Sequence, residues 1–475
     1  MATTALPRHV VFTVPKHGTN TYMHSDTYEY PDDTSAYRDT YVFRQDDGFV
    51  FEGKDDIFSE QVKIEIEPSK TDDKCVHLRF SHKNKYWQKN AGDDSIVAVS
   101  NKPEEDREKE SCTLFEVIQE SNVLYFTHVQ TGWSVTVNNS TRAFYLAQNS
   151  FSAALGFVDW DTLVKLPKHV AFLGDNRKYL MAVRDNHNYL QFGSDDTNDI
   201  LSGYEVSATY DGHVRIKSDQ WGLFWRWADN SIWADSDDVT ADDIATLFWP
   251  VKIDERTIAL RCAGNNKFCK RLTDDTLKNY LNAAATNITT EARLKVQELV
   301  MERKIYNVMY RMEDARIYEE TPYLAGTTTV TNNANEAGSI AVTIKYKEET
   351  SYYFSQIMSV SSGVKSSITA EIPSIGEASI ETTHQISTAF RWNNATTTIW
   401  YVTKTGTVTV PARSVAVVHY VGMKGTCDVP FSYTQQDMSS IDGKIMETDQ
   451  IDGVFTGVNA YSLKFTVHKY EPLPE

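Results

Sequence analysis

The sequence predicts an all-β protein in which two related domains precede an elongated β module. Three observations support this prediction. Short β-branched and aromatic runs separated by polar turns recur through the first 300 residues. The string from Leu6 to Val10 returns, with one change, from Leu166 to Val170, which indicates a duplicated domain. From about residue 304 onward, long strand-like runs rich in Ser and Thr replace the short units.

Each copy of the duplicated domain contains three smaller units. Short strands with polar turns, three units per copy and no helix between them favour two β-trefoils, in residues 1–162 and 163–303. Aromatic residues near the unit ends are expected to pack in the trefoil cores; they are Phe115, Phe157, Tyr204 and Phe248. The strand-like starts of the six units are Val10, Leu78, Leu124, Val170, Val214 and Ile258.

The overall charge narrows the possible partners. With 47 basic and 65 acidic residues the chain has a net charge of −18, which argues against nucleic acid because phosphate-backbone binding requires a positive face. The N-terminal residues lack the basic and apolar regions of a secretion signal, so we expect a soluble protein made in the cytoplasm. The five cysteines form no CxxC pair, which favours reduced thiols over disulfides or a zinc site.

No motif of a known catalytic class is present. The sequence contains no HExxH, no GxSxG and no Gly-rich phosphate loop, and its histidines lack paired metal spacing. The abundant carboxylates leave a catalytic pair of the glycosidase type as an alternative, but the chain has no length left for a separate catalytic domain. We therefore expect no enzymatic activity, no catalytic residue, no bound metal and no cofactor.

The third segment, residues 304–475, contains a two-armed amphipathic pattern at 362–388. Apolar and polar residues alternate along two arms of eleven residues, 362–372 and 378–388. In an extended strand, each arm therefore has an apolar face and a polar face. The arm length matches the 9 to 11 residues of a tilted transmembrane β-strand. A turn is expected from Pro373 to Glu377. The pattern indicates a membrane hairpin, with a solvent-facing hairpin of an ordinary sheet as the alternative.

Four strings occur in order within the first 300 residues. They are Glu67-Pro68-Ser69-Lys70-Thr71, Cys112-Thr113-Leu114-Phe115, Leu190-Gln191-Phe192-Gly193 and Ala283-Ala284-Ala285-Thr286-Asn287. These strings resemble the amaranthin-type lectins, which consist of tandem β-trefoils called agglutinin domains. This resemblance implies a carbohydrate-binding half that assembles as a homo-oligomer. In the family, the galactose β1-3 N-acetylgalactosamine site lies between the first trefoil of one protomer and the second trefoil of its partner.

The family's sugar-stacking aromatics are replaced in this chain. Ser95 and Ile96 stand where the family has a Tyr-Trp pair, and Ser231 stands where it has another tryptophan. The absence of these aromatic rings argues against binding of the family's disaccharide, because sugar sites usually combine an aromatic face with convergent polar groups. Other residues are therefore candidates for glycan binding, with core or interface packing as the alternative. They are Trp87, Trp221, Trp227, Asp229, Asn230 and Trp233.

The third segment resembles the aerolysin family of β-pore-forming proteins, on its architecture and on the stretches Arg311–Tyr318 and Thr327–Asn335. The resemblance implies protomers that form a ring and insert one hairpin each into a shared barrel, which satisfies every backbone group within lipid. The residues then expected to face lipid are Val364, Ile368, Ala370, Ile372, Ile375, Ala378, Ile380 and Ile386. Those expected to face the pore lumen are Ser367, Thr369, Glu371, Ser379, Glu381 and Thr383.

Together these features predict a lectin-targeted pore-forming protein with a role in plant defence, in which the trefoils bind glycans and the third module inserts into membranes. The main alternative is a soluble glycan-binding protein of stress or defence whose third module serves only for oligomerisation. In a third reading, the trefoils bind proteins.

Overall fold

The computed structural model describes residues 6–14, 40–54, 56–148, 152–184, 188–237, 243–356, 359–360, 364–377 and 379–474. The chain divides into two compact units, one that contains residues 1–300 and one that contains most of the remainder. Over the described ranges, none of the helices has the length and apolar content to cross a bilayer. The helices are 3-10 turns: η2 (Glu60–Val62), η3 (His82–Asn84), η4 (Trp160–Thr162), η5 (Ile244–Thr246), η6 (Thr290–Ala292) and η7 (Met312–Asp314).

The first sheet closes six strands into a ring. Strand β1 pairs with β4, and the ladder continues through β5, β8, β9 and β12 back to β1. Three hairpins, β2–β3, β6–β7 and β10–β11, contact one another through isolated bridges. A six-stranded ring with three hairpins is a β-trefoil. The strands are β1 (His9–Thr13), β2 (Tyr41–Arg44), β3 (Val50–Lys54), β4 (Ile64–Pro68), β5 (Cys75–Phe80), β6 (Lys85–Lys89), β7 (Ile96–Ser100), β8 (Leu114–Glu120), β9 (Val123–His128), β10 (Trp133–Val137), β11 (Phe144–Ala147) and β12 (Leu155–Asp159).

The second sheet repeats this topology. Its ring runs from β13 through β16, β17, β20, β21 and β24 back to β13, and its hairpins are β14–β15, β18–β19 and β22–β23. The strands are β13 (His169–Leu173), β14 (Tyr179–Ala182), β15 (Leu190–Ser194), β16 (Tyr204–Ala208), β17 (Val214–Ser218), β18 (Phe224–Ala228), β19 (Ser231–Ser236), β20 (Phe248–Lys252), β21 (Thr257–Cys262), β22 (Phe268–Leu272), β23 (Tyr280–Ala285) and β24 (Leu294–Glu298).

The predicted pair of trefoils is confirmed, and the six predicted unit starts each lie in the first strand of a four-stranded unit. All six are fully buried, because these strands form the ring around each core. The residues expected to close the units lie in the fourth strands, where Phe115, Tyr204 and Phe248 are fully buried and Phe157 packs at the edge of the first core. The five cysteines are free thiols, all of them buried.

A half-buried carboxylate organises the turn after β4 in the first trefoil. Glu105 accepts hydrogen bonds from Ser69 Oγ, the Lys70 amide and Thr71 Oγ1 at 2.7, 2.9 and 2.8 Å. Its Oε1 also lies 3.1 Å from Nε2 of His77, a buried residue of β5. Burial by itself raises the pKa of Glu105, but these hydrogen bonds outweigh it and lower the pKa to about 2.

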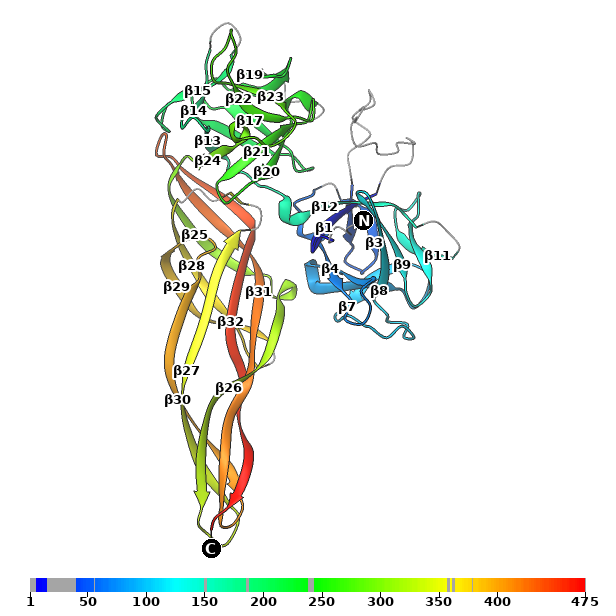
Figure 1. The fold of residues 1–475 in the computed structure, drawn as a ribbon, viewed down its shortest axis with the longest axis vertical. Helices are drawn as coiled ribbons and strands as arrows, with labels where there is room; N and C mark the ends of the chain where they lie inside the picture. The colour runs from blue at the N-terminus through cyan, green and yellow to red at the C-terminus, as the bar shows by residue number, and fades with distance from the viewer. Residues whose placement is uncertain are drawn as a thin grey trace. The chain divides into compact units, whose positions relative to one another are not determined.

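The third module is an eight-stranded sheet in the order β29-β28-β25-β31-β32-β27-β30, with β26 paired to β31. At about 3.3 Å per residue, the 26-residue β31 extends for roughly 85 Å, and Figure 1 shows the long strands running the length of this module. The strands are β25 (Val300–Tyr310), β26 (Arg316–Asn332), β27 (Gly338–Gln356), β28 (Lys365–Ile375), β29 (Ile380–Phe390), β30 (Thr396–Val410), β31 (Ser414–Ser439) and β32 (Ile445–Pro472).

In one half of the third module, β27 separates from β32 and the strands lie in two layers. Strand β27 pairs with β32 only from Ser351 to Gln356, while its ladder with β30 continues back to Gly338. Beyond the split, the β27–β30 ribbon packs over β26, β31 and β32. The small core between these layers contains Val342, Val408, Val410, Ala416 and Val418.

We expect Glu105→Gln to lower the free energy of unfolding by about 2 kcal/mol at pH 7, because a neutral amide cannot replace the carboxylate's charge-assisted hydrogen bonds. The folded pKa of about 2 lies below the usual 4.5, so this contribution is present above pH 4.5 and is lost as the pH falls toward 2. Urea unfolding of the full chain at pH 7 and pH 3 measures the difference. Glu108→Gln, at an exposed glutamate nearby, is the control. An equal effect of Glu105→Gln at both pH values would contradict this prediction.

Candidate functional site

Trp87, one of the predicted glycan contacts, lies in the core of the first trefoil. Its side chain has no exposed surface, and its ring packs against Phe12, Phe80, Phe115 and Phe144 with centroids 5.7–6.3 Å apart. A fully buried ring cannot stack on a sugar, so the prediction is wrong for Trp87 and the core alternative holds. Ile96, which replaces a family aromatic, is also fully buried.

Two of the other tryptophans are partly used in packing within the second trefoil. Trp221 donates a hydrogen bond from Nε1 to the carbonyl of Ala182 at 2.8 Å, and the guanidinium of Arg184 lies 5.0 Å from its ring centroid. Trp227 packs on the core and lies so close to Gly264 that a Cβ there would be 2.6 Å from the ring. Both rings are half-buried, so only their outer edges remain open to a ligand.

The remaining candidates come together on the β18–β19 hairpin. Asp229 and Asn230 form its turn, with positive φ values of 49° and 64° that Asp and Asn tolerate well. Both side chains are exposed, and Asn265 Nδ2 donates to Asn230 Oδ1 at 3.2 Å. Trp233 is also half-buried and lies on the outward face of β19, between the buried Ile232 and Ala234.

The outward face of this hairpin also holds an ion pair that the sequence prediction missed. Arg226 lies directly opposite Trp233 in the ladder and donates two hydrogen bonds to the carboxylate of Asp235, at 3.0 and 2.7 Å. The pairing with Asp235 raises the pKa of Arg226. Strand alternation around the Asp229-Asn230 turn is the signal that places Arg226 beside Trp233. Trp233, Arg226 and Asp235 form an aromatic surface bordered by fixed polar groups, which we call the Trp233 face.

The hairpin predicted at 362–388 is present as β28 and β29, two antiparallel strands of eleven residues each that are shifted two to three residues from the predicted arms. The described residues that were expected to face lipid are directed at the protein's own core. In β28, Ile368, Ala370, Ile372 and Ile375 are 0–7% exposed, in a cluster with Phe354, Phe431 and Phe455. Val364, Ile380 and Ile386 are half-buried, and Ala378 lies outside the described residues.

The opposite face of the hairpin meets solvent. Glu371, Ser379, Glu381 and Thr383 are exposed, while Ser367 and Thr369 are half-buried. Thus the residues expected to line a pore lumen lie on the polar face of the folded hairpin.

The predicted turn from Pro373 to Glu377 is wrong, because β28 extends to Ile375. Pro373 pairs with Thr382 at a register shift in the ladder, where its missing N–H is tolerated. Strand β29 begins at Ile380, and the Gly376 amide donates a hydrogen bond to the Ser379 carbonyl at 2.8 Å. Ile375, expected at the leading tip, is therefore 4% exposed in the folded chain.

The tip of the hairpin is held by an asparagine of β32. The Ile375 amide donates to Asn459 Oδ1, and Asn459 Nδ2 donates to the Ile375 carbonyl, both at 2.9 Å. One side chain thus satisfies the donor and the acceptor of a buried residue, as a neighbouring strand would. The hydroxyl of Tyr310 also donates to the Glu371 carbonyl. We call the contact between Asn459 and Ile375 the tip clamp; no local pattern predicts it, because 84 residues separate the partners.

A family model of the agglutinin domain matches residues 40–159 and 164–300. The chain belongs to the agglutinin-domain family. The matched ranges contain the strands of the two trefoils except β1, so the Trp233 face lies in the second agglutinin domain and the hairpin lies outside both. No curated protein sequence matches the chain.

Solved structures share parts of the architecture at low identity. A lamprey immune protein is 10% identical with a TM-score of 0.30, covering 74% of this chain and 87% of its own. A mosquitocidal holotoxin is 11% identical with a TM-score of 0.30, covering 65% and 36%. An aerolysin-like protein of Bombina maxima is 10% identical with a TM-score of 0.24, covering 36% and 99%. At this level of similarity, functional arguments rest on the chain's own residues.

The strings that carried the family resemblance have structural roles in the agglutinin domains. Ser69, Lys70 and Thr71 form the turn that Glu105 holds, and Thr113 Oγ1 lies 2.8 Å from Nδ1 of the buried His77. Phe192 and Ala283 lie in the core of the second domain. These strings therefore indicate the trefoil fold and do not identify which sugar is bound.

We expect Asn459→Ala to loosen the hairpin tip, because it leaves the buried amide and carbonyl of Ile375 without partners. The loss of about 2 kcal/mol corresponds to roughly thirtyfold faster hydrogen exchange over residues 370–377. Exchange measured by mass spectrometry tests this, with Asn333→Ala in the exposed turn after β26 as the control. Equal exchange in the two variants would rule out the tip clamp as a stabilising contact.

Proposed function

We propose that the protein is a carbohydrate-binding, pore-forming protein that acts without catalysis. Its agglutinin domains bind a glycan on a target surface, and the β28–β29 hairpin then leaves the third module. Hairpins from several copies of the chain form a transmembrane β-barrel. A role in defence follows from this activity.

The observation that carries the proposal is the two-faced hairpin. Its apolar face is covered by the Phe354, Phe431 and Phe455 cluster, and its polar face carries Glu371, Glu381 and Thr383. An apolar face covered by protein can be covered equally by lipid, because both surroundings exclude water from it. Polar residues on the other face suit a water-filled lumen.

The way in which the hairpin is attached also supports release as a unit. Strand β28 pairs with the rest of the sheet through its ladder with β25, from Glu302↔Lys365 to Ile305↔Ile368. Among the described residues, β29 pairs only with β28, over nine residue pairs. Beyond Ile368 the tip clamp and the Tyr310 hydrogen bond hold the hairpin. Separation breaks this short ladder while the hairpin's own ladder remains intact.

For glycan recognition, the Trp233 face offers an outward tryptophan beside an oriented Asp235 and an exposed Asn230. Stacking of a sugar ring on Trp233 leaves its hydroxyls within reach of carboxylate and amide groups. This arrangement supports glycan binding through residues other than the replaced family aromatics.

We expect Trp233→Ala to reduce glycan binding by about tenfold or more, because the apolar face of the sugar loses its stacking partner. Binding of the full chain to a glycan array measures this, and Trp233→Phe, which keeps a ring, should retain part of the signal. Trp400→Ala removes a 47% exposed tryptophan of β30 and serves as the matched control. Unchanged array signals for Trp233→Ala would exclude the Trp233 face as the binding surface.

A disulfide between β25 and β28 tests hairpin release. Lys304 and Ser367 are partners in the parallel ladder, so the double variant Lys304→Cys with Ser367→Cys can form a cross-link on the more exposed face. The oxidised protein should release at least tenfold less dye from target vesicles than the reduced protein. The native cysteines are buried and should not compete.

The control cross-link joins Thr343 and Thr405, whose hydroxyl oxygens lie 3.2 Å apart between β27 and β30. Oxidising Thr343→Cys with Thr405→Cys should leave dye release unchanged, because neither strand leaves the module. Equal release by the oxidised and reduced hairpin cross-link would contradict insertion of this hairpin. Absence of release by the unmodified protein on every glycan-bearing vesicle would favour the soluble alternative, in which the third module only mediates oligomerisation.

A further inference from the structure

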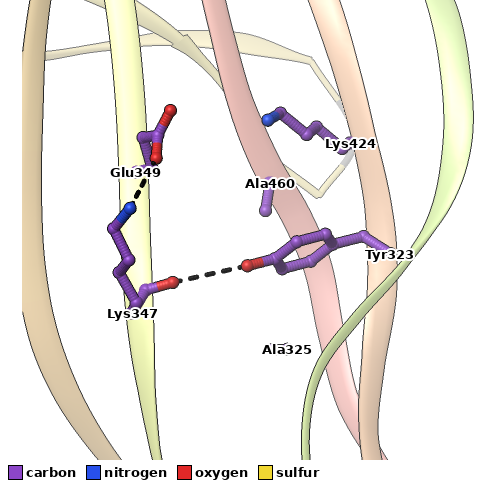
Figure 2. A pocket seen from close by; sticks show the side chains of 6 residues that line it. All are labelled: Tyr323, Ala325, Lys347, Glu349, Lys424 and Ala460. Carbon is purple, nitrogen blue, oxygen red and sulfur yellow. Dashed lines mark hydrogen bonds and ion pairs between the residues drawn. The ribbon is translucent and has the colours of Figure 1, made fainter.

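A hollow of about 270 Å³ opens in the third module where β27 separates from β32. Strand β27 borders one side, and β26, β31 and β32 border the other (Figure 2). The small side chains of Ala325 and Ala460 leave this space unfilled. The lining residues are Tyr323, Ala325, Lys347, Glu349, Lys424 and Ala460.

The hollow contains two ammonium groups and one carboxylate. Lys347 Nζ lies 3.0 Å from Glu349 Oε2, which lowers the pKa of Glu349 and raises that of Lys347. Figure 2 shows Lys424 reaching from β31 toward these two residues. Among the described residues, no hydrogen bond or ion pair to the Lys424 ammonium is found. The hollow thus carries an excess positive charge in a chain whose net charge is −18.

The rim of the hollow adds apolar surface. In the β27–β30 ladder, Tyr401 lies opposite Lys347 and Ile399 lies opposite Glu349. The two side chains are 85% and 47% exposed. Tyr323 is held in place by a 3.4 Å hydrogen bond from its hydroxyl to the Lys347 carbonyl. A charged group in the hollow would therefore sit beside an exposed aromatic ring and an aliphatic side chain.

We propose that this hollow binds a phosphate group. The ammonium groups of Lys347 and Lys424 neutralise the phosphate from opposite sides, since a phosphate carries about two negative charges and accepts several hydrogen bonds. Glu349 is an internal competitor that occupies Lys347 until the phosphate displaces it. Ile399 and Tyr401 then contact the organic part of the ligand, either a phospholipid headgroup or a soluble phosphate ester.

Because Glu349 competes with the phosphate for Lys347, substitutions of Lys424 and Glu349 should have opposite effects on phosphate binding. Lys424→Gln removes one counter-charge and should weaken phosphate binding about tenfold, the value of one charge-assisted contact. Glu349→Gln removes the competitor and frees Lys347, so it should strengthen binding several-fold. A purely structural role of these residues would not produce a gain on removing Glu349.

Phosphorus NMR titration of inorganic phosphate with the full-length protein tests the proposal, and Lys404→Gln, an exposed lysine on β30, is the matched control. Saturable binding that Lys424→Gln weakens, Glu349→Gln strengthens and Lys404→Gln leaves unchanged would support it. No saturable binding, or equal binding by all variants, would overturn it. The outcome does not depend on glycan binding or hairpin release.

Vesicle sedimentation then identifies the source of the phosphate. Vesicles of phosphatidylcholine with phosphatidic acid are compared with phosphatidylcholine alone, at a salt concentration near physiological. Stronger binding of Glu349→Gln to the phosphatidic acid vesicles would identify a lipid headgroup. Binding restricted to inorganic phosphate in solution would identify a soluble ligand.

Discussion

Burial of the apolar face of β28 is the interaction on which the third module depends. Ile368, Ile372 and Ile375 bury nearly all of their surface, and three such side chains contribute about 6 kcal/mol. The same face closes the cluster formed by Phe354, Phe431 and Phe455. Removing the hairpin therefore exposes apolar surface on both partners, and only another apolar environment can compensate for this loss.

Hydrogen bonding imposes a second condition on the hairpin. An isolated hairpin in lipid leaves two edges unpaired, and each unpaired backbone group costs several kcal/mol there. The ladder between β28 and β29 satisfies the groups inside the hairpin, while the ladder with β25 and the tip clamp satisfy part of the outer edge of β28. A membrane-inserted form must replace these outer bonds with bonds to neighbouring copies, so insertion and assembly are linked energetically.

The two agglutinin domains pair the backbone groups at their strand edges in a different way. Each closes six strands into a ring, so the ring strands have partners on both sides and their inward residues form the core. Residues of the hairpins and turns can then vary to bind different ligands, because changes there do not disrupt the ring. The Trp233 face lies on such a hairpin, whereas Trp87 occupies the core and is constrained by packing.

The sequence by itself determined the secondary-structure class, the duplication, the six unit starts and the two-faced character of β28, because strand period and repeat spacing are local properties. It misplaced the hairpin turn, since Pro373 suggests a break that a register shift in the ladder accommodates. Only the tertiary structure decided that Trp87 is buried, that Asn459 holds the hairpin tip, and that Lys424 lies in one hollow with Lys347 and Glu349. These placements depend on which strands become neighbours, and a contact across 84 residues, such as that between Asn459 and Ile375, leaves no local signal in the chain.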